Sequence, residues 1–374
     1  MTNQITNKED PHYRFEQGPI RPPSEAESLL LRVTRNCPWN QCTFCGLYKG
    51  EKFSIRPLEE VLRDIESIRQ AITGIETGEL NTENLDPWVL ASSRNWRENG
   101  MKSVFLQDAN TLSVPPNDLI VILEAIRKNF PEVERITSYA RSKTIAKLPD
   151  DDLKRLASAG LSRIHIGMES GSDRVLTMVK KGSDKETHIL AGKKVKKAGI
   201  ELSEYIMPGL GGAKNHKEHA LETASALNQI NPDFIRIRTL ALSDRSQLAT
   251  DVENGNFEKA GDVHVAEELL LLIENLGGIT STILSDHILN LLPEVEGVLP
   301  QDKNRIIKVI QGFLELDSDE QMVYIIGRRQ GIMGGLYDLN SQARRRHALE
   351  FIHANQVTIQ NVDAFADELM KRYI

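Results

Sequence analysis

Apolar positions along the chain alternate between short runs and helical stripes. The run LLLRVT at 29–34 fits a buried strand, and the segment 57–72 then places apolar residues three and four positions apart, as one face of a helix requires. The same order of a strand and then a helix recurs five more times. The predicted strands are 102–107, 134–140, 162–168, 200–207 and 233–242, and the helices that follow them are 117–130, 150–160, 184–199, 216–230 and 265–277, respectively. Six such pairs predict parallel strands joined by helical crossovers.

The pattern therefore predicts an α/β fold, a partial (β/α)6 TIM-like barrel with a helical C-terminal extension. Residues 1–28 are polar, contain prolines and lack a period, so we expect an N-terminal arm there. The barrel is expected to span 29–245, with an insertion at 74–100, and the mostly helical C-terminal region spans 246–374. In a parallel barrel the chemistry lies at the carboxyl ends of the strands.

Composition and charge narrow the class of protein. No run of about 18 apolar residues and no signal-peptide pattern occurs, so we expect a cytoplasmic protein without a membrane segment. The net charge of −7 offers no basic field for phosphate backbones, which makes nucleic acid an unlikely partner by this criterion.

The three cysteines of the chain, Cys37, Cys42 and Cys45, all lie within nine positions after the first predicted strand. In a reducing compartment such a cluster indicates a metal site rather than a disulfide framework. Three thiolates can hold three irons of a four-iron, four-sulfur (4Fe-4S) cluster and leave the fourth iron open. A zinc site completed by a distant His, or three small buried side chains, are the alternative interpretations.

The stretch RVTRNCPWNQCTFCGLYK resembles the cluster loop of the radical S-adenosylmethionine (radical SAM) superfamily. The usual spacing there is three residues and then two, whereas this chain has four and then two. The resemblance covers about 29–242 and implies that Cys37, Cys42 and Cys45 ligate a 4Fe-4S cluster. It also implies S-adenosyl-L-methionine as a second cofactor, with Phe44 near its adenine.

Further cofactor-binding residues follow from the resemblance. Asp108, in QDAN, corresponds to the turn that receives the methionine amino group; a turn or helix cap is the alternative. Glu169, in IGMESGSD, corresponds to a residue that meets the ribose or the amino-acid end, and its alternative is a structural ion pair. Lys181 aligns with a basic residue aimed at the methionine carboxylate; by itself it would be a solvated lysine.

Two arginines and one polar cluster complete the candidates. Arg236 and Arg238 alternate with isoleucines, so we expect both to be buried toward the lumen, with the methionine carboxylate, an acidic substrate or an internal salt bridge as partner. The cluster LSDHILN at 284–290 follows a possible extra strand, ITSTIL. It is expected either to reach the open end of the barrel or to form a cap and an exposed helix.

The resemblance implies a radical SAM enzyme that reductively cleaves S-adenosylmethionine to a 5′-deoxyadenosyl radical, which acts on an unidentified substrate, small molecule or other. An electron donor such as flavodoxin or ferredoxin is then a partner. No side chain is predicted to be catalytic. Two alternatives stay open: a noncatalytic iron–sulfur or haem-handling protein on the same barrel, and a zinc-binding protein.

Overall fold

The computed structural model describes residues 14–80 and 85–373. The chain divides into two compact units, each described by itself below. Unit 1 comprises the residues up to Pro38, Lys52–Tyr139 and Lys154–Arg163, and unit 2 comprises Trp39–Glu51, Ala140–Leu153 and Ile164–Ile374.

Unit 1 contains three parallel strands in the order β1 (Leu29–Arg32), β4 (Ser103–Gln107) and β5 (Arg135–Tyr139). All five residues of β4 are buried, because this strand has a neighbour on each side. A short antiparallel pair, β2 (Thr34–Arg35) with β3 (Ser54–Ile55), follows β1. The predicted first strand at 29–34 therefore spans β1 and the start of β2.

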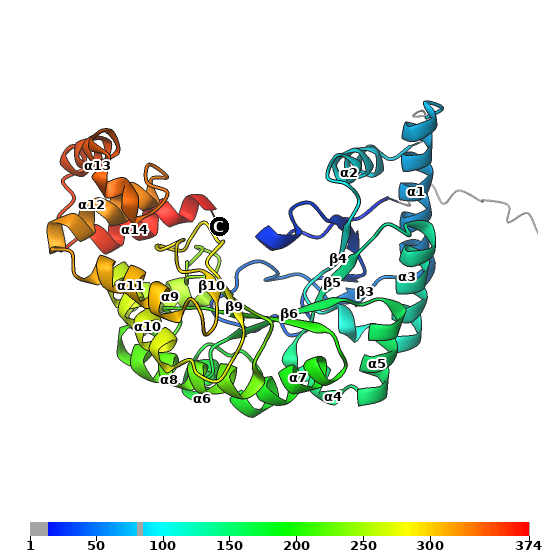
Figure 1. The fold of residues 1–374 in the computed structure, drawn as a ribbon, viewed down its shortest axis with the longest axis horizontal. Coiled ribbons are helices and arrows are strands. Elements are labelled where there is room, and N and C mark those ends of the chain that lie inside the picture. The colour runs from blue at the N-terminus through cyan, green and yellow to red at the C-terminus, as the bar shows by residue number, and fades with distance from the viewer. Residues whose placement is uncertain (1–13, 81–84, 374) are drawn as a thin grey trace, which may run out of the picture. The chain divides into compact units, whose positions relative to one another are not determined.

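Three helices of unit 1 pack together: α1 (Leu58–Thr77), α2 (Pro87–Glu98) and α3 (Pro116–Asn129) (Figure 1). The apolar stripe predicted for α1 is buried, and the helix runs past the expected end at residue 72 to Gly78, where φ is +74°. The stretch predicted as an insertion contains α2. Its Trp96 is fully buried, packs edge-on against Phe130 with ring centres 5.0 Å apart, and donates to the Ser103 carbonyl.

The described part of the N-terminal arm lies on unit 1, with a short 3-10 turn, η1, at Pro23–Glu25. The Gly18 N–H donates to Gln107 Oε1 at 2.9 Å, and Gln107 Nε2 donates to the Ile20 carbonyl at 2.6 Å. Glu16 pairs with Arg35 at 2.5 Å. The arm therefore covers the carboxyl end of β4 by specific polar contacts.

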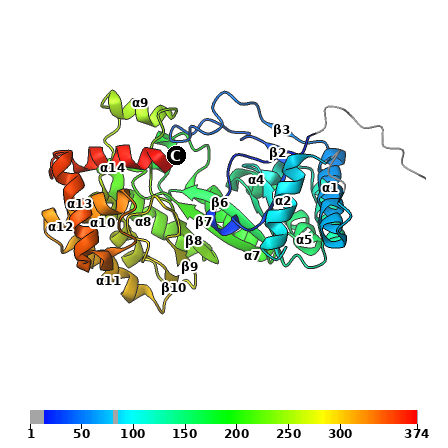
Figure 2. The ribbon, with the colours of Figure 1, turned by 90° about the horizontal axis from the view of Figure 1, so that it is seen from above.

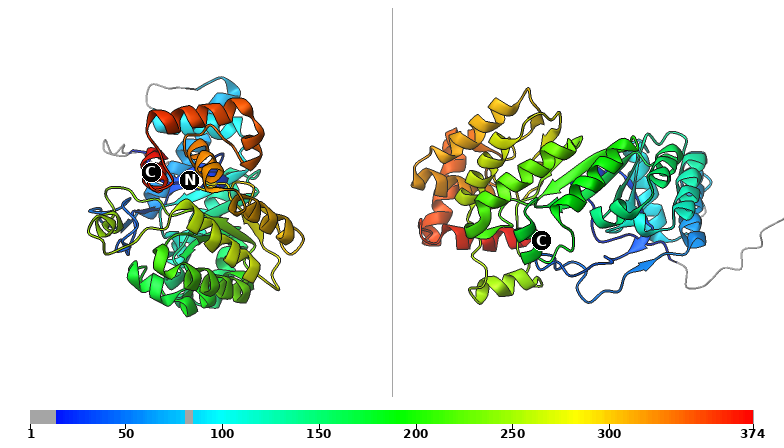
Figure 3. Two further views of the ribbon diagram at one scale, coloured as in Figure 1. Left: turned by 90° about the vertical axis from the view of Figure 1, so that its left-hand side faces the viewer. Right: turned by 90° about the horizontal axis from the view of Figure 1, so that it is seen from below.

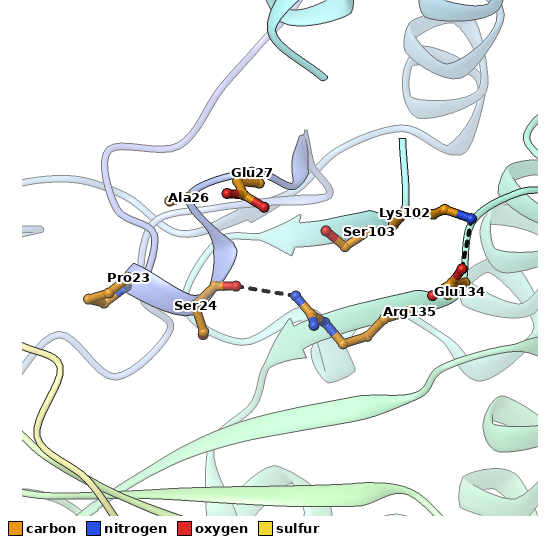
Figure 4. A pocket seen from close by; sticks show the side chains of 8 residues that line it. All are labelled: Pro23, Ser24, Ala26, Glu27, Lys102, Ser103, Glu134 and Arg135. Carbon is orange, nitrogen blue, oxygen red and sulfur yellow. Dashed lines mark hydrogen bonds and ion pairs between the residues drawn. The ribbon is translucent and has the colours of Figure 1, made fainter. Parts of the chain in front are cut away.

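A hollow of about 380 Å³ lies at the opposite, amino-terminal ends of β4 and β5 (Figure 4). Three of its charged lining residues are paired: Lys102 with Glu134 at 2.7 Å, and Arg135 with the buried Glu25 at 3.2 Å and with the Ser24 carbonyl. Since active sites of parallel α/β folds lie at the carboxyl ends of strands, this hollow belongs to the scaffold of the fold.

Unit 2 carries the strand order β6 (Arg163–Glu169), β7 (Glu201–Ile206), β8 (Phe234–Ile237), β9 (Thr282–Leu284) and β10 (Gly297–Val298). Strands β7, β8 and β9 run parallel, side by side in Figure 2, and β10 is antiparallel to β9. The possible extra strand after residue 278 is therefore real, and β10 adds a further one. The six strands predicted for the βα units are all present, and in unit 2 only β10, with two residues, was not predicted.

The helices of unit 2 follow the βα order and then continue alone. Those interleaved with strands are α4 (Ser142–Lys147), α5 (Asp150–Ala159), which crosses the unit boundary, α6 (Asp173–Met178), α7 (Lys185–Lys197), α8 (Gly212–Ile230), α9 (Gln247–Glu253) and α10 (Asp262–Asn275). The C-terminal set is α11 (Lys303–Leu314), α12 (Ser318–Arg329), α13 (Gln342–Ala354) and α14 (Val362–Met370), with the 3-10 turns η3 (Leu336–Asn340) and η4 (Lys371–Tyr373). The 3-10 turn η2 (Thr111–Ser113) belongs to unit 1. Figure 3 shows α12, α13 and α14 gathered together in orange and red.

The α/β fold with mostly parallel strands and a helical C-terminal extension is thus confirmed. Among the residues that the structure describes, no helix is both long and apolar enough to cross a membrane.

Candidate functional site

The three cysteines lie in the chain between β2 and β3, and none is in a disulfide. Each is partly exposed. Asn36 and Asn40, with φ of +66° and +48°, turn the backbone on either side of Cys37; asparagine tolerates this left-handed region. Cys37 belongs to unit 1, whereas Cys42 and Cys45 belong to unit 2.

The donor set of this loop suits a 4Fe-4S cluster. Within residues 14–80 and 85–373, no three His, Cys, Asp or Glu side chains are spaced to hold a single metal ion. A cubane has a different requirement, because each of its irons takes its own thiolate. Three partly exposed thiols outside any disulfide can therefore serve three irons.

Two other segments of unit 2 hold the part of this loop that carries Cys42 and Cys45. The Thr43 N–H donates to the Val179 carbonyl at 3.0 Å, and the Thr43 carbonyl accepts from the Leu248 N–H at 2.8 Å. The Trp39 indole donates to the Lys180 carbonyl at 2.7 Å. The segment after α6 and the start of α9 thus fix the backbone around the two thiols.

Glu169 and Lys181 form an ion pair close to that loop. Lys181 Nζ lies 2.9 Å from Glu169 Oε1 and 5.8 Å from the centre of the Phe44 ring. Burial by itself lowers the pKa of Lys181, but the negative charges of Glu169 and Cys42 outweigh it and leave this pKa raised. The structure therefore brings together Phe44, Glu169 and Lys181, three of the residues predicted to bind the cofactor.

Gly167 has no side chain and so leaves space for the Glu169–Lys181 ion pair. A Cβ atom at this position would lie 2.2 Å from Glu169 Oε1 and 3.2 Å from Lys181 Nζ. Glu169 itself ends β6 with φ of +65°, and its carboxylate lies on the same face of the strand as the Gly167 Cβ would. The carboxylate thus folds back over the glycine.

A second ion pair, which sequence analysis missed, holds the backbone at Glu169. His219 Nε2 lies 3.2 Å from the Glu169 carbonyl, and His219 Nδ1 lies 2.9 Å from Glu268 Oε1. The same carboxylate oxygen accepts the Gly209 N–H at 3.0 Å. His219 and Glu268 stand on the buried faces of α8 and α10, and a charged residue on an otherwise apolar helix face is the signal that could have indicated them.

Asp108, in unit 1, is buried and already has a cationic partner. Its Oδ2 accepts from Arg32 Nη2 at 2.7 Å and from the Asn36 N–H at 3.0 Å, while Oδ1 has no hydrogen-bond partner among the described residues. A Cβ on Gly18 of the arm would lie 1.8 Å from Oδ1. Burial raises the pKa of Asp108 despite Arg32 and Asn36, which lower it. Asp108 therefore ties the cysteine loop to the strand end.

The two predicted lumen arginines differ. Arg236 is buried and forms an ion pair with Asp286, the internal salt bridge that sequence analysis left open. Arg238 is exposed, so its expected burial was wrong: β8 ends at Ile237, and the strand alternation no longer applies. Asn290 accepts the Thr239 N–H at 2.9 Å and donates to the Ile237 carbonyl.

The cluster 284–290 is neither a cap nor a helix, because Leu284 ends β9 and residues 285–290 form irregular loop structure. The Leu289 N–H donates to His287 Nδ1 at 3.2 Å. Burial lowers the pKa of His287 to about 4, and the charge of Arg238 adds to this effect. His287 is therefore neutral at physiological pH.

Comparison with known proteins adds the family. A family model described as the Radical SAM superfamily matches residues 89–224, a range that begins after the cysteines. The 4'-phospho-dehydrooxetanocin synthase of Priestia megaterium is 26% identical over 226 residues, which cover 54% of this chain and 27% of that protein. A tRNA-2-methylthio-N(6)-dimethylallyladenosine synthase of Hydrogenovibrio crunogenus is 27% identical over 186 residues, covering 49% of this chain and 34% of that protein.

The chain thus spans about a third or less of the length of these curated relatives. Among solved structures, the crystal structure of methylornithine synthase superposes with a TM-score of 0.44 at 14% identity, covering 76% of this chain and 82% of that one. Superfamily membership implies a 4Fe-4S cluster and S-adenosylmethionine. Over its central βα units, residues 89–224, the chain thus matches the model of the radical SAM superfamily.

Proposed function

We propose that this chain binds S-adenosylmethionine at a 4Fe-4S cluster held by Cys37, Cys42 and Cys45, and that reductive cleavage there yields a 5′-deoxyadenosyl radical that acts on a substrate. The observation that carries the proposal is the Glu169–Lys181 ion pair, which lies beside Phe44 and near Cys42 in unit 2.

The ion pair matches the charges of the cofactor's methionine end, which has one carboxylate and one ammonium group. Lys181 would take the carboxylate, and Glu169 would take the ammonium group or a ribose hydroxyl. When Glu169 takes the ammonium group, exchanging one partly buried ion pair for two new ones keeps every charge compensated, which avoids the cost of burying a lone charge. The Phe44 ring offers an apolar face for the adenine.

Phe44, Glu169 and Lys181 lie together in unit 2, whereas Arg236 is engaged by Asp286 and Asp108 by Arg32. We therefore assign direct cofactor contacts to Phe44, Glu169 and Lys181. When bound, the cluster supplies one electron to the cofactor.

Anaerobic reconstitution tests the function. We expect about four irons and four sulfides per chain, a reduced electron paramagnetic resonance spectrum that changes on addition of S-adenosylmethionine, and formation of 5′-deoxyadenosine with dithionite. One zinc without sulfide would favour the zinc protein. A full cluster without cofactor cleavage would favour a noncatalytic iron–sulfur or haem-handling protein.

Two sets of variants separate cluster from cofactor. Replacing Cys37, Cys42 or Cys45 by Ala should abolish cleavage and lower the iron content. Glu169→Gln should keep the iron content but weaken cofactor binding about 10- to 100-fold, since a charge-assisted hydrogen bond contributes about 1.5–3 kcal/mol. Glu186→Gln, at an exposed position of α7, is the matched control and should bind normally.

No substrate is assigned. Of the two curated relatives described above, one is named for a tRNA product and the other for 4'-phospho-dehydrooxetanocin. The net charge of −7 favours a small molecule over a nucleic acid. Turnover with total tRNA and turnover with a small-molecule extract would decide between these classes. The readout is the rate of 5′-deoxyadenosine formation above the rate without substrate.

A further inference from the structure

A basic hollow lies on unit 2 next to the cysteine loop. It has a volume of about 360 Å³ and is lined by Asn40, Gln41, Thr43, Lys49, Lys180, Arg245 and Gln247. Lys180 and Arg245 are exposed, and Lys49 is half-buried, with its ammonium donating to the Asn40 carbonyl at 2.9 Å. The lining contains three cations and no carboxylate.

These cations are uncompensated. Lys49, Lys180 and Arg245 form no ion pair with the residues that the structure describes. Elsewhere on the chain cations pair readily with carboxylates, and the chain as a whole carries a charge of −7. A local surplus of positive charge on an acidic protein indicates a surface whose negative partner comes from another molecule.

The hollow is built on the cluster loop itself. Gln41 and Thr43 flank Cys42 in the chain, and a Cβ on Gly46, which follows Cys45, would lie 3.1 Å from the Arg245 Cβ. The Lys180 carbonyl accepts the Trp39 indole N–H, and Lys180 directly precedes Lys181. The hollow therefore lies within a few residues of two of the three thiols.

We propose that this hollow is the docking surface for a small acidic protein that delivers electrons one at a time. The inference rests on the proposed function, because reductive cleavage needs an external reductant. In each encounter the donor is oxidised by one electron and the cluster is reduced by one.

A binding titration of the reconstituted full chain with oxidised flavodoxin tests the surface without any turnover. The double variant Lys180→Glu, Arg245→Glu should weaken binding at least about tenfold at low salt, and the difference should shrink to about twofold at high salt, because exposed charges are screened. Lys193→Glu, at an exposed position of α7, is the matched control and should change the affinity less than about twofold.

Two further measurements separate the docking surface from the function. With dithionite the double variant should form 5′-deoxyadenosine as the unaltered chain does, whereas with flavodoxin it should be slow. Unchanged flavodoxin affinity, or an equal loss in the control variant, would overturn the docking surface while dithionite-driven cleavage still supports the function. Binding of tRNA that exceeds flavodoxin binding and is lost in the double variant would also overturn it. Absence of cleavage with dithionite in the unaltered chain would refute the function itself.

Discussion

Replacing Glu268 by Gln is expected to destabilise the protein by about 1.5–3 kcal/mol, the contribution of a hydrogen bond to a charged group. Glu268 and His219 are almost fully buried, and one oxygen of Glu268 serves both His219 Nδ1 at 2.9 Å and the Gly209 N–H at 3.0 Å. Gln keeps the size of the side chain, so the loss reports the charge rather than a cavity.

The predicted loss depends on pH. Burial alone lowers the pKa of His219, but the Glu268 carboxylate outweighs it, and the pKa of His219 in the folded protein is raised. The pair therefore stabilises the fold fully below the unfolded-state pKa of about 6.5, and this stabilisation is lost as the pH rises through the raised value. The destabilisation by Glu268→Gln should accordingly be largest near pH 6 and should shrink toward pH 9.

Thermal melts and urea unfolding at pH 6, 7, 8 and 9 measure this effect. At pH 6 we expect the melting temperature to fall by about 3–12 °C, from about 2–4 °C per kcal/mol for a domain of this size. Glu267→Gln, at the exposed neighbouring position on α10, is the control and should stay within about 0.5 kcal/mol.

A destabilisation by Glu268→Gln that is the same from pH 6 to pH 9 would refute the ion pair, because only the titration of His219 makes the loss depend on pH. A loss no larger than that of Glu267→Gln would do the same. Because His219 also contacts the Glu169 carbonyl at 3.2 Å, we expect the variant to bind S-adenosylmethionine more weakly as well.

Three further outcomes follow. Gly167→Ala should lower cofactor affinity while iron content stays unchanged, since its Cβ would lie 2.2 Å from Glu169 Oε1; normal affinity in a titration would contradict this placement. Burial raises the pKa of Glu204 well above its usual range, and its carboxyl group has no hydrogen-bond partner in the part of the chain that the structure describes. The melting temperature of Glu204→Gln should therefore rise relative to that of the unaltered chain as the pH goes from 5 to 8; a constant difference would argue against a buried acid. Asp262→Ala should lower the free energy of unfolding in urea by about 3–5 kcal/mol, because the buried Arg329 loses its ion-pair partner. A loss below about 1 kcal/mol would show that water reaches that pair.

The sequence by itself determined the order of the elements and the place of the cysteines. The stripe of 57–72 predicted α1 because a helix repeats every 3.6 residues, and the short apolar run at 102–107 predicted β4 because a strand buried on both faces is apolar throughout. The position of the three thiols after the first strand is likewise a local property of the chain. A strand as short as β10 leaves too few positions for a period to be recognised.

Only the tertiary structure decided which charges meet. Arg236 forms an ion pair with Asp286, fifty positions away in the chain, and Asp108 forms one with Arg32. His219 and Glu268 meet because α8 packs against α10, and nothing near either residue in the chain indicates the other. Periodicity reports which face of an element is buried, but the partner of a buried charge depends on how distant elements pack, and burial is costly enough that each such charge must find one.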